Sequence, residues 1–194
     1  MDYYMHNSDM TVELESNKVN ILFTQTESFK VTLVDTGLTT KTAGRLQKIR
    51  PYIGNEDFML TYGDGLSNIN IKDLVKYHRG HGKLATVSAV QPEARFGGME
   101  LGEINQVITF KEKPKGDGQW INGGYFVLSP GVFDYLGDQA DDTMWEEGPL
   151  ENLSKNGQLM AYKHSGFWKC MDAMRDKIEL ENLWNNQEAK WKVW

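Results

Sequence analysis

The order of elements expected between residues 57 and 90 constrains the fold most strongly. The apolar run from Asp57 to Tyr62 predicts a strand, Asn70 is placed to begin a helix, and the run from Leu84 to Val90 predicts a second strand. One face of the predicted helix carries Leu74, Val75 and His78. Strand, helix and strand in this order form a parallel or mixed sheet covered by helices. The sequence therefore predicts an α/β fold.

The rest of the chain supplies further elements of what we expect to be one domain, residues 1–194. Further strands are predicted at residues 10–15, 20–25 and 29–34, and from Trp120 to Leu128, with the first two paired around the turn-like Ser16-Asn17. Helices are predicted at residues 42–49 and 173–185, the second with Met174, Ile178 and Leu183 facing inward. Residues 96–110 alternate around Gly102-Glu103, which predicts a hairpin.

A carboxylate between two glycines follows the strand that ends at Tyr62. The motif is Gly63-Asp64-Gly65, and ligands of open α/β sheets gather at the carboxyl ends of such strands. Glycines on both sides allow tight turns and close approach by a large anion. Asp64 is therefore a candidate for binding a metal and a phosphate. The alternative is an ordinary turn, because Asp and Gly are common turn residues.

Three more segments place polar residues at the ends of apolar runs. Glu112-Lys113-Pro114 follows one run, Asn122-Gly123-Gly124 opens another, and Asp172 follows the run that contains Trp168. The order Gly-Asp-Gly, Glu-Lys-Pro, Asn-Gly-Gly and strand-end Asp resembles the sugar-1-phosphate nucleotidylyltransferases. The similarity extends from about residue 10 to Trp194 and is greatest to the glucose-1-phosphate cytidylyltransferase branch. The segments that carry it are 31–37, 42–46, 96–97, 112–118, 121–124, 167–168 and 171–172.

That resemblance implies a Rossmann-like, mixed and mainly parallel sheet flanked by helices. It also implies a reaction in which an oxygen of glucose 1-phosphate attacks the α-phosphate of CTP, giving CDP-glucose and pyrophosphate. No protein nucleophile is needed, because the protein aligns two anions and neutralises their charge with a divalent cation. The implied cofactor is Mg²⁺, and in the family the product feeds the synthesis of bacterial surface polysaccharide such as O-antigen.

The same resemblance assigns roles to individual residues. Asp64 and Asp172 are expected to hold the metal, while Lys113 is expected to meet the sugar phosphate. Further substrate contacts are expected at Gly44, Arg45, Tyr62, Gly63, Gly65, Glu112, Asn122 and Gly123.

Each role has a structural alternative. Glu112 and Lys113 could be a solvated strand end, and Arg45 an exposed helix charge. Asp172 could cap the following helix and pair with Arg175.

One family motif is absent from the 194 residues. The Gly-Gly-x-Gly-Thr-Arg loop that grips the nucleotide triphosphate does not occur, and residues 1–8 resemble a helix that follows that loop. We therefore expect a domain without its first βαβ portion and with impaired transfer. Two alternatives stay open: a related transferase that uses another nucleotide or sugar, and a non-catalytic sugar-nucleotide-binding or assembly subunit.

Composition narrows the choice of partners and compartment. A net charge of −6 without a block of Lys or Arg does not suit a general nucleic-acid binder. The sequence shows no signal peptide or long apolar span, and Cys170 has no second cysteine to pair with, so we expect a cytoplasmic protein without membrane contact. Cys170 is expected to be a packed thiol, since no base accompanies it. We expect a homo-oligomer, because members of the resembled family form oligomers and several tryptophans lie near the C-terminus.

Overall fold

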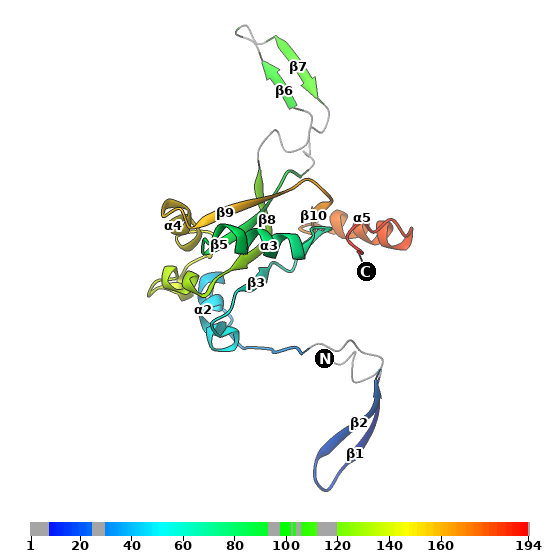
Figure 1. Ribbon diagram of the computed structural model, residues 1–194. Helices are drawn as coiled ribbons and strands as arrows, with labels where there is room; N and C mark the ends of the chain where they lie inside the picture. The colour runs from blue at the N-terminus through cyan, green and yellow to red at the C-terminus, as the bar shows by residue number, and fades with distance from the viewer. Residues whose placement is uncertain are drawn as a thin grey trace. The chain divides into compact units, whose positions relative to one another are not determined.

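The computed structural model describes residues 8–24, 30–92, 98–101, 103, 106–111 and 120–193. The chain divides into two compact units, residues Met1–Asp35 and Thr36–Trp194. Figure 1 shows the elements of both units.

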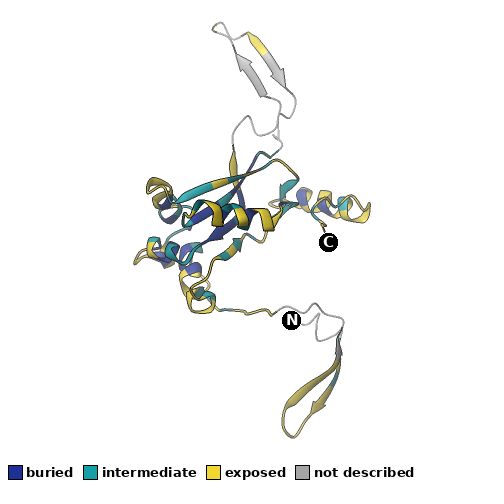
Figure 2. Cartoon of the chain, viewed as in Figure 1, coloured by how far each residue is buried: buried dark blue, intermediate teal, exposed yellow. Residues whose placement is uncertain are grey.

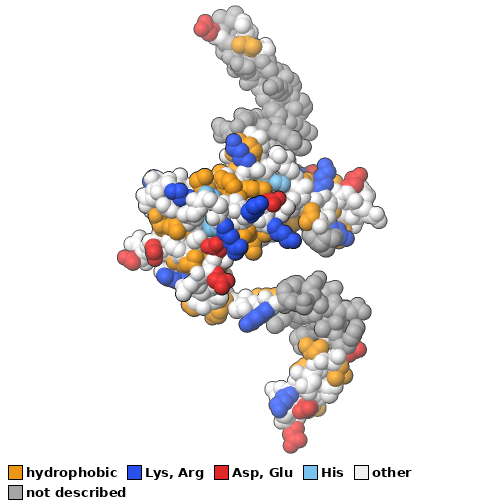
Figure 3. Space-filling model, in the orientation of Figure 1, with side chains coloured by type: hydrophobic (Ala, Val, Ile, Leu, Met, Phe, Trp, Pro, Cys, Tyr) orange, Lys and Arg blue, Asp and Glu red, His pale blue; other side chains and the backbone are white. Residues whose placement is uncertain are grey.

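The first unit contains an antiparallel hairpin of β1 (Ser8–Glu13) and β2 (Lys18–Thr24). Asn17 turns the chain with a positive φ of 54°, so the two neighbouring strands predicted around Ser16-Asn17 are confirmed. Apolar side chains of this hairpin are exposed, and they appear as orange atoms in Figure 3. The exposed residues are Val12, Leu14, Val19, Ile21 and Leu22.

The third strand predicted in this region, at residues 29–34, is wrong for its described part. Residues 30–34 are not in a strand, and Val31 and Leu33 remain 60% and 77% exposed. An alternating pattern makes a strand only where a neighbour pairs with its backbone and covers one face. Phe29 lies outside the described residues.

The second unit is built on a four-stranded sheet in the order β3-β8-β5-β9. Its strands are β3 (Phe58–Thr61), β5 (Ala85–Val90), β8 (Ile121–Leu128) and β9 (Leu159–His164). β8 is antiparallel to both β3 and β5, and β5 is parallel to β9, so β3, β5 and β9 run in one direction. The predicted mixed α/β sheet is confirmed. The strand–helix–strand order is also present, although β8 lies between β3 and β5.

Helices α2 (Thr42–Ile53), α3 (Ile71–His81), α4 (Pro149–Lys155) and α5 (Met174–Asn185) accompany the sheet. α3 contacts β5, β8 and β9. The side chain of Asn70 caps α3 by accepting hydrogen bonds from the backbone N–H groups of Lys72 and Asp73 at 3.0 and 3.3 Å, as the sequence predicts. Leu74 and His78 on its inner face are buried. α2 begins where predicted and continues four residues further, to Ile53.

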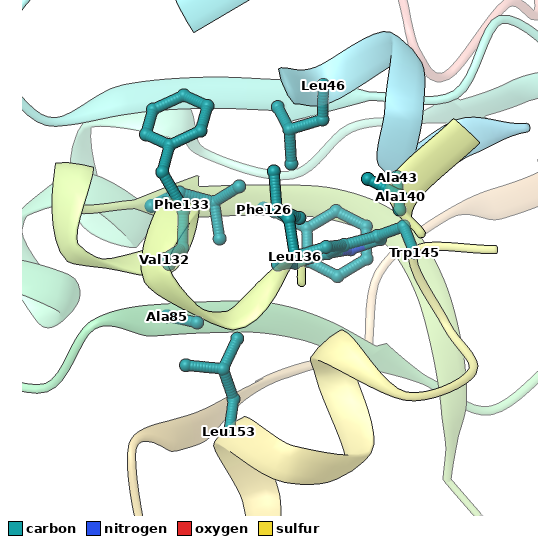
Figure 4. Close-up of a cluster of buried hydrophobic side chains, with 11 residues drawn as sticks. Ala43, Leu46, Ala85, Phe126, Val132, Phe133, Leu136, Ala140, Trp145 and Leu153 are labelled. Carbon is teal, nitrogen blue, oxygen red and sulfur yellow. The ribbon is translucent and has the colours of Figure 1, made fainter. Parts of the chain in front are cut away.

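The main core lies between the sheet and the segment that follows β8. That segment contains the short 3₁₀ helices η2 (Pro130–Tyr135) and η3 (Ala140–Asp142). Figure 4 shows their apolar side chains meeting those of α2 and the sheet, around Phe126 and Trp145, each 1% exposed. Figure 2 shows the buried stretch along β8 and β5. β8 and β5 are the two inner strands of the sheet, and Phe126, Val127 and Leu128 of β8 are all buried.

The inward face predicted for the last helix is wrong at Met174 and Ile178, whereas Leu183 is half-buried. Met174 and Ile178 are 70% and 51% exposed, whereas Asp176 and Leu180 are the buried residues of α5. The Asp176 carboxylate accepts the backbone N–H of Ala173 at 3.0 Å, so this buried charged group has a hydrogen-bond partner on the face that it shares with Leu180.

Two short antiparallel pairs complete the second unit. β4 (Gly65–Ser67) pairs with β10 (Trp168–Cys170), and β6 (Gly98–Leu101) pairs with β7 (Val107–Lys111), as the predicted hairpin requires. Among the described residues, none of the helices has both the length and the apolar character needed to cross a membrane.

Candidate active site

The pairing of β4 with β10 brings the two predicted metal-binding aspartates to the same place. Gly65 lies opposite Cys170, and the backbone N–H of Met171 donates to the carbonyl of Asp64 at 2.8 Å. Asp64 precedes β4 and Asp172 follows β10, so an antiparallel pair puts both at one end. Both carboxylate residues are exposed and line one cleft.

That cleft has a volume of about 1160 Å³, slightly above the usual range of ligand pockets. Its walls come from the ends of β5, β8 and β10 and from α5. The sequence-predicted residues along it are Tyr62, Asp64, Gly65, Asn122, Gly123 and Asp172. Gly63 joins Tyr62 to Asp64 in the same loop. The structure thus gathers most of the described candidates into one site.

The start of β8 forms a closely packed wall of this cleft. A Cβ on Gly123 would come within 2.6 Å of Ser88 Oγ, and Gly124 has a positive φ of 78° with the Tyr62 ring 3.0 Å from its would-be Cβ. The Trp168 Nε1–H donates to the Gly123 carbonyl at 2.7 Å. Glycine is therefore required here for packing, and the exposed Asn122 is the residue that can contact a ligand.

Tyr62 is held by a residue that the sequence analysis did not identify. Its phenol O–H donates to Glu146, and the Asn122 amide donates to the phenol oxygen at 3.4 Å. Burial raises the pKa of Tyr62 above its ordinary value, and the bond to Glu146 raises it further. Tyr62 is therefore a neutral phenol at physiological pH. Glu146 is 84 residues away in the sequence, so no local pattern points to it.

Basic side chains that line the same cleft were also missed as a group. Lys169, Arg175 and Lys190 line the cleft, and Lys169 forms an ion pair with Glu179. The alternating charges around Asp172 are the sequence feature that could have pointed to these basic residues. Such cations can offset the charge of bound phosphates.

The structural alternative for Asp172 is wrong. The N-cap position of α5 is Ala173, and Arg175 lies 3.8 Å from the Asp176 carboxylate instead. Asp172 instead interacts with Cys170. Burial raises the pKa of the Cys170 thiol, and the hydrogen bond of this thiol to Asp172 raises the pKa further. Cys170 is thus a protonated packed thiol, as the sequence predicts.

Other predicted site residues do not line this cleft. A Cβ added to Gly44 would lie 2.6 Å from the Cα of Asp141. The Arg45 guanidinium donates a hydrogen bond to Thr36 Oγ1 at 2.6 Å. The close neighbours of Gly44 are therefore Asp141 and Thr40. Glu112 and Lys113 lie outside the described residues.

Residues 5–176 match the nucleotidyl transferase family, and the chain belongs to that family. Within it, the chain is 44% identical over all 194 residues to the glucose-1-phosphate cytidylyltransferases of Salmonella typhi and Salmonella typhimurium. The chain covers 74% of the length of each of these relatives.

Solved structures with the same fold are more distant in sequence. A UDP-glucose pyrophosphorylase complexed with UDP-glucose matches with a TM-score of 0.56 and 16% identity, over 79% of this chain and 65% of its own. A Bacillus anthracis structure described as a glucose-1-phosphate thymidylyltransferase matches with a TM-score of 0.57 and 18% identity, over 78% and 62% of the two chains. These matches establish the fold.

Proposed function

We propose that this chain transfers a cytidylyl group from CTP to glucose 1-phosphate, forming CDP-glucose and pyrophosphate. The observation that carries the proposal is the convergence of Asp64, Asp172 and Asn122 on one cleft, in a chain 44% identical to glucose-1-phosphate cytidylyltransferases. A phosphate oxygen of the sugar phosphate attacks the α-phosphorus of CTP, and the bond to the β-phosphate breaks as pyrophosphate leaves. The protein contributes alignment and charge neutralisation rather than a nucleophile.

The sugar side of the site would use neutral and charged hydrogen-bonding groups together. Asn122 offers an amide at the cleft wall, and Glu112 and Lys113 are proposed to contact the sugar and its phosphate. Lys169, Arg175 and Lys190 supply further positive charge along the same cleft.

Asp64 and Asp172 are the residues that would hold Mg²⁺. Among the residues that the structure describes, no cluster of three or more His, Cys, Asp or Glu side chains forms a complete metal cage. Two exposed carboxylates in one cleft nevertheless fit Mg²⁺, which commonly uses one or two carboxylates together with phosphates and waters. When bound, the ion would neutralise phosphate charge.

The first experiment measures pyrophosphate release from CTP, glucose 1-phosphate and Mg²⁺. We expect Asp64→Asn and Asp172→Asn each to lower the rate by about 100-fold or more. Asp138→Asn is the matched control, because Asp138 is exposed and does not line the cleft. Release at the wild-type rate from both cleft variants would contradict the proposed site.

A second candidate function is sugar-phosphate binding without transfer. Calorimetric binding of glucose 1-phosphate without pyrophosphate release would support this candidate. Competition among CTP, UTP, dTTP and GTP tests the base. The proposed homo-oligomer and the cytoplasmic location stay predictions.

A further inference from the structure

We propose that Glu146 is a positioning residue that orients Asn122 for the sugar through the phenol of Tyr62. The inference rests on the proposed function, in which Asn122 receives the sugar hydroxyls. Glu146 itself does not line the cleft, whereas Tyr62 and Asn122 do. Glu146 would therefore act through Tyr62 and Asn122 without touching the ligand itself.

A continuous set of hydrogen bonds connects these residues. Both carboxylate oxygens of Glu146 are used, one by the Tyr62 O–H and the other by the Thr42 hydroxyl at 3.4 Å. The Asn122 Nδ2 group donates to the Tyr62 oxygen at 3.4 Å, and the Asn122 Oδ1 accepts the backbone N–H of Gly124 at 2.8 Å. The start of α2 is thus linked to the sugar-facing wall.

The chemistry of the groups gives this chain of bonds one direction. A phenol has a single proton, and an ionised carboxylate can only accept, so the proton of Tyr62 points to Glu146. The Tyr62 oxygen must then accept from the Asn122 amide nitrogen.

A fixed Asn122 amide has defined capacity left for a ligand. One N–H of its nitrogen is directed at Tyr62 and one acceptor site of its oxygen at Gly124. The hydrogen bonds among the described residues leave the second N–H and the second acceptor site of this amide for a ligand in the cleft. A sugar hydroxyl both donates and accepts, so it can use such an oriented amide.

A purely structural role for Glu146 predicts a different result. Thr42 Oγ1 also accepts the backbone N–H of Trp145 at 2.7 Å, so Glu146 could simply fasten its segment to α2. In that case its removal would lower stability and leave the affinity for the sugar phosphate unchanged.

Three variants of the full chain test the inference: Glu146→Ala, Glu146→Gln and Tyr62→Phe. By calorimetry, we expect Glu146→Ala and Tyr62→Phe each to raise the Kd for glucose 1-phosphate about tenfold, with the KM for CTP unchanged. Glu146→Gln should stay within about threefold of wild type, because its amide oxygen can accept the same bond. The double variant Glu146→Ala/Tyr62→Phe should again be about tenfold weaker, since both changes break one path.

A second readout does not depend on the activity. The side-chain amide signal of Asn122 in a ¹⁵N-correlated NMR spectrum, assigned by its loss in Asn122→Asp, should shift in Glu146→Ala and not in Glu146→Gln. An unshifted signal, or an unchanged Kd in Glu146→Ala, would overturn the inference. A folded wild-type chain that binds no glucose 1-phosphate would instead refute the proposed function and the sugar part of this inference, while the Asn122 signal still decides the positioning.

Discussion

Two helical glycines should respond in opposite ways to the same substitution. Gly44 lies in α2 and Gly80 in α3, and helix propensity alone favours alanine by up to about 1 kcal/mol at each position. At Gly80 no described atom lies within 4 Å of an added Cβ. At Gly44 the added carbon would lie 2.5 Å from Asp141 Oδ1 and 2.6 Å from Asp141 Cα.

The cost at Gly44 follows from what holds α2 in place. The backbone of Lys41 donates to the Asp141 carbonyl at 2.9 Å and that of Ala43 to the Thr143 carbonyl at 3.1 Å. Relieving a clash with backbone moves α2 away from η3 and stretches these bonds. Overpacking of this kind costs about 1–3 kcal/mol. We therefore expect Gly44→Ala to lower the free energy of unfolding by about 2 kcal/mol and Gly80→Ala to raise it by about 0.5–1 kcal/mol.

Urea unfolding followed by tryptophan fluorescence measures both changes. Equal stabilisation by the two substitutions would refute the packing argument. Calorimetry with CTP on folded Gly44→Ala protein adds a second test, because a glycine needed only for packing leaves the affinity unchanged. Weakened binding by a variant of wild-type stability would instead favour the ligand contact expected from the sequence.

Three further predictions concern stability. Burial lowers the pKa of His78, with His81 and Arg79 also lowering it and Asp57 opposing, so its neutral form is favoured in the fold. Neutral His78 therefore stabilises the fold fully above the pKa of histidine in the unfolded chain, about 6.5. This stabilisation is lost as the pH falls below that pKa. The free energy of unfolding should therefore decrease from pH 7 to pH 5, and decrease less in His78→Gln; equal slopes would contradict this. Trp168→Phe removes the donor to the Gly123 carbonyl and should cost about 1 kcal/mol in urea unfolding, a result that an unchanged midpoint would exclude. Asn70→Ala should cost about 1 kcal/mol through the lost cap of α3, whereas no change in thermal midpoint would show that water replaces the cap.

The errors of the sequence analysis have a common physical cause. Residues 30–34 alternate like a strand and Met174 and Ile178 repeat like an inward helix face, yet neither set is buried. A pattern shows which residues could share a face, but burial depends on a neighbour that the local sequence does not contain. Asp176 shows the reverse case, because it is a charged residue that is buried and hydrogen-bonded to the backbone N–H of Ala173.

Long-range pairing likewise decided the candidate site. Asp64 and Asp172 were found from their positions at strand ends, but only the pairing of β4 with β10 puts them beside one cleft. The contact of Glu146 with Tyr62 and the gathering of Lys169, Arg175 and Lys190 along one cleft exist only in the folded chain. Glu112 and Lys113 stay predictions.

The sequence by itself determined the features that depend on near neighbours along the chain. These are the hairpin around Asn17, the cap at Asn70, the strand ends before Asp64 and Asp172, and the α/β class. Only the tertiary structure decided that β8 lies between β3 and β5, that Gly44 faces backbone, and that Glu146 reaches Tyr62. Local conformation follows from propensities and bonds over a few residues, whereas strand order and side-chain partners depend on which distant surfaces are buried together.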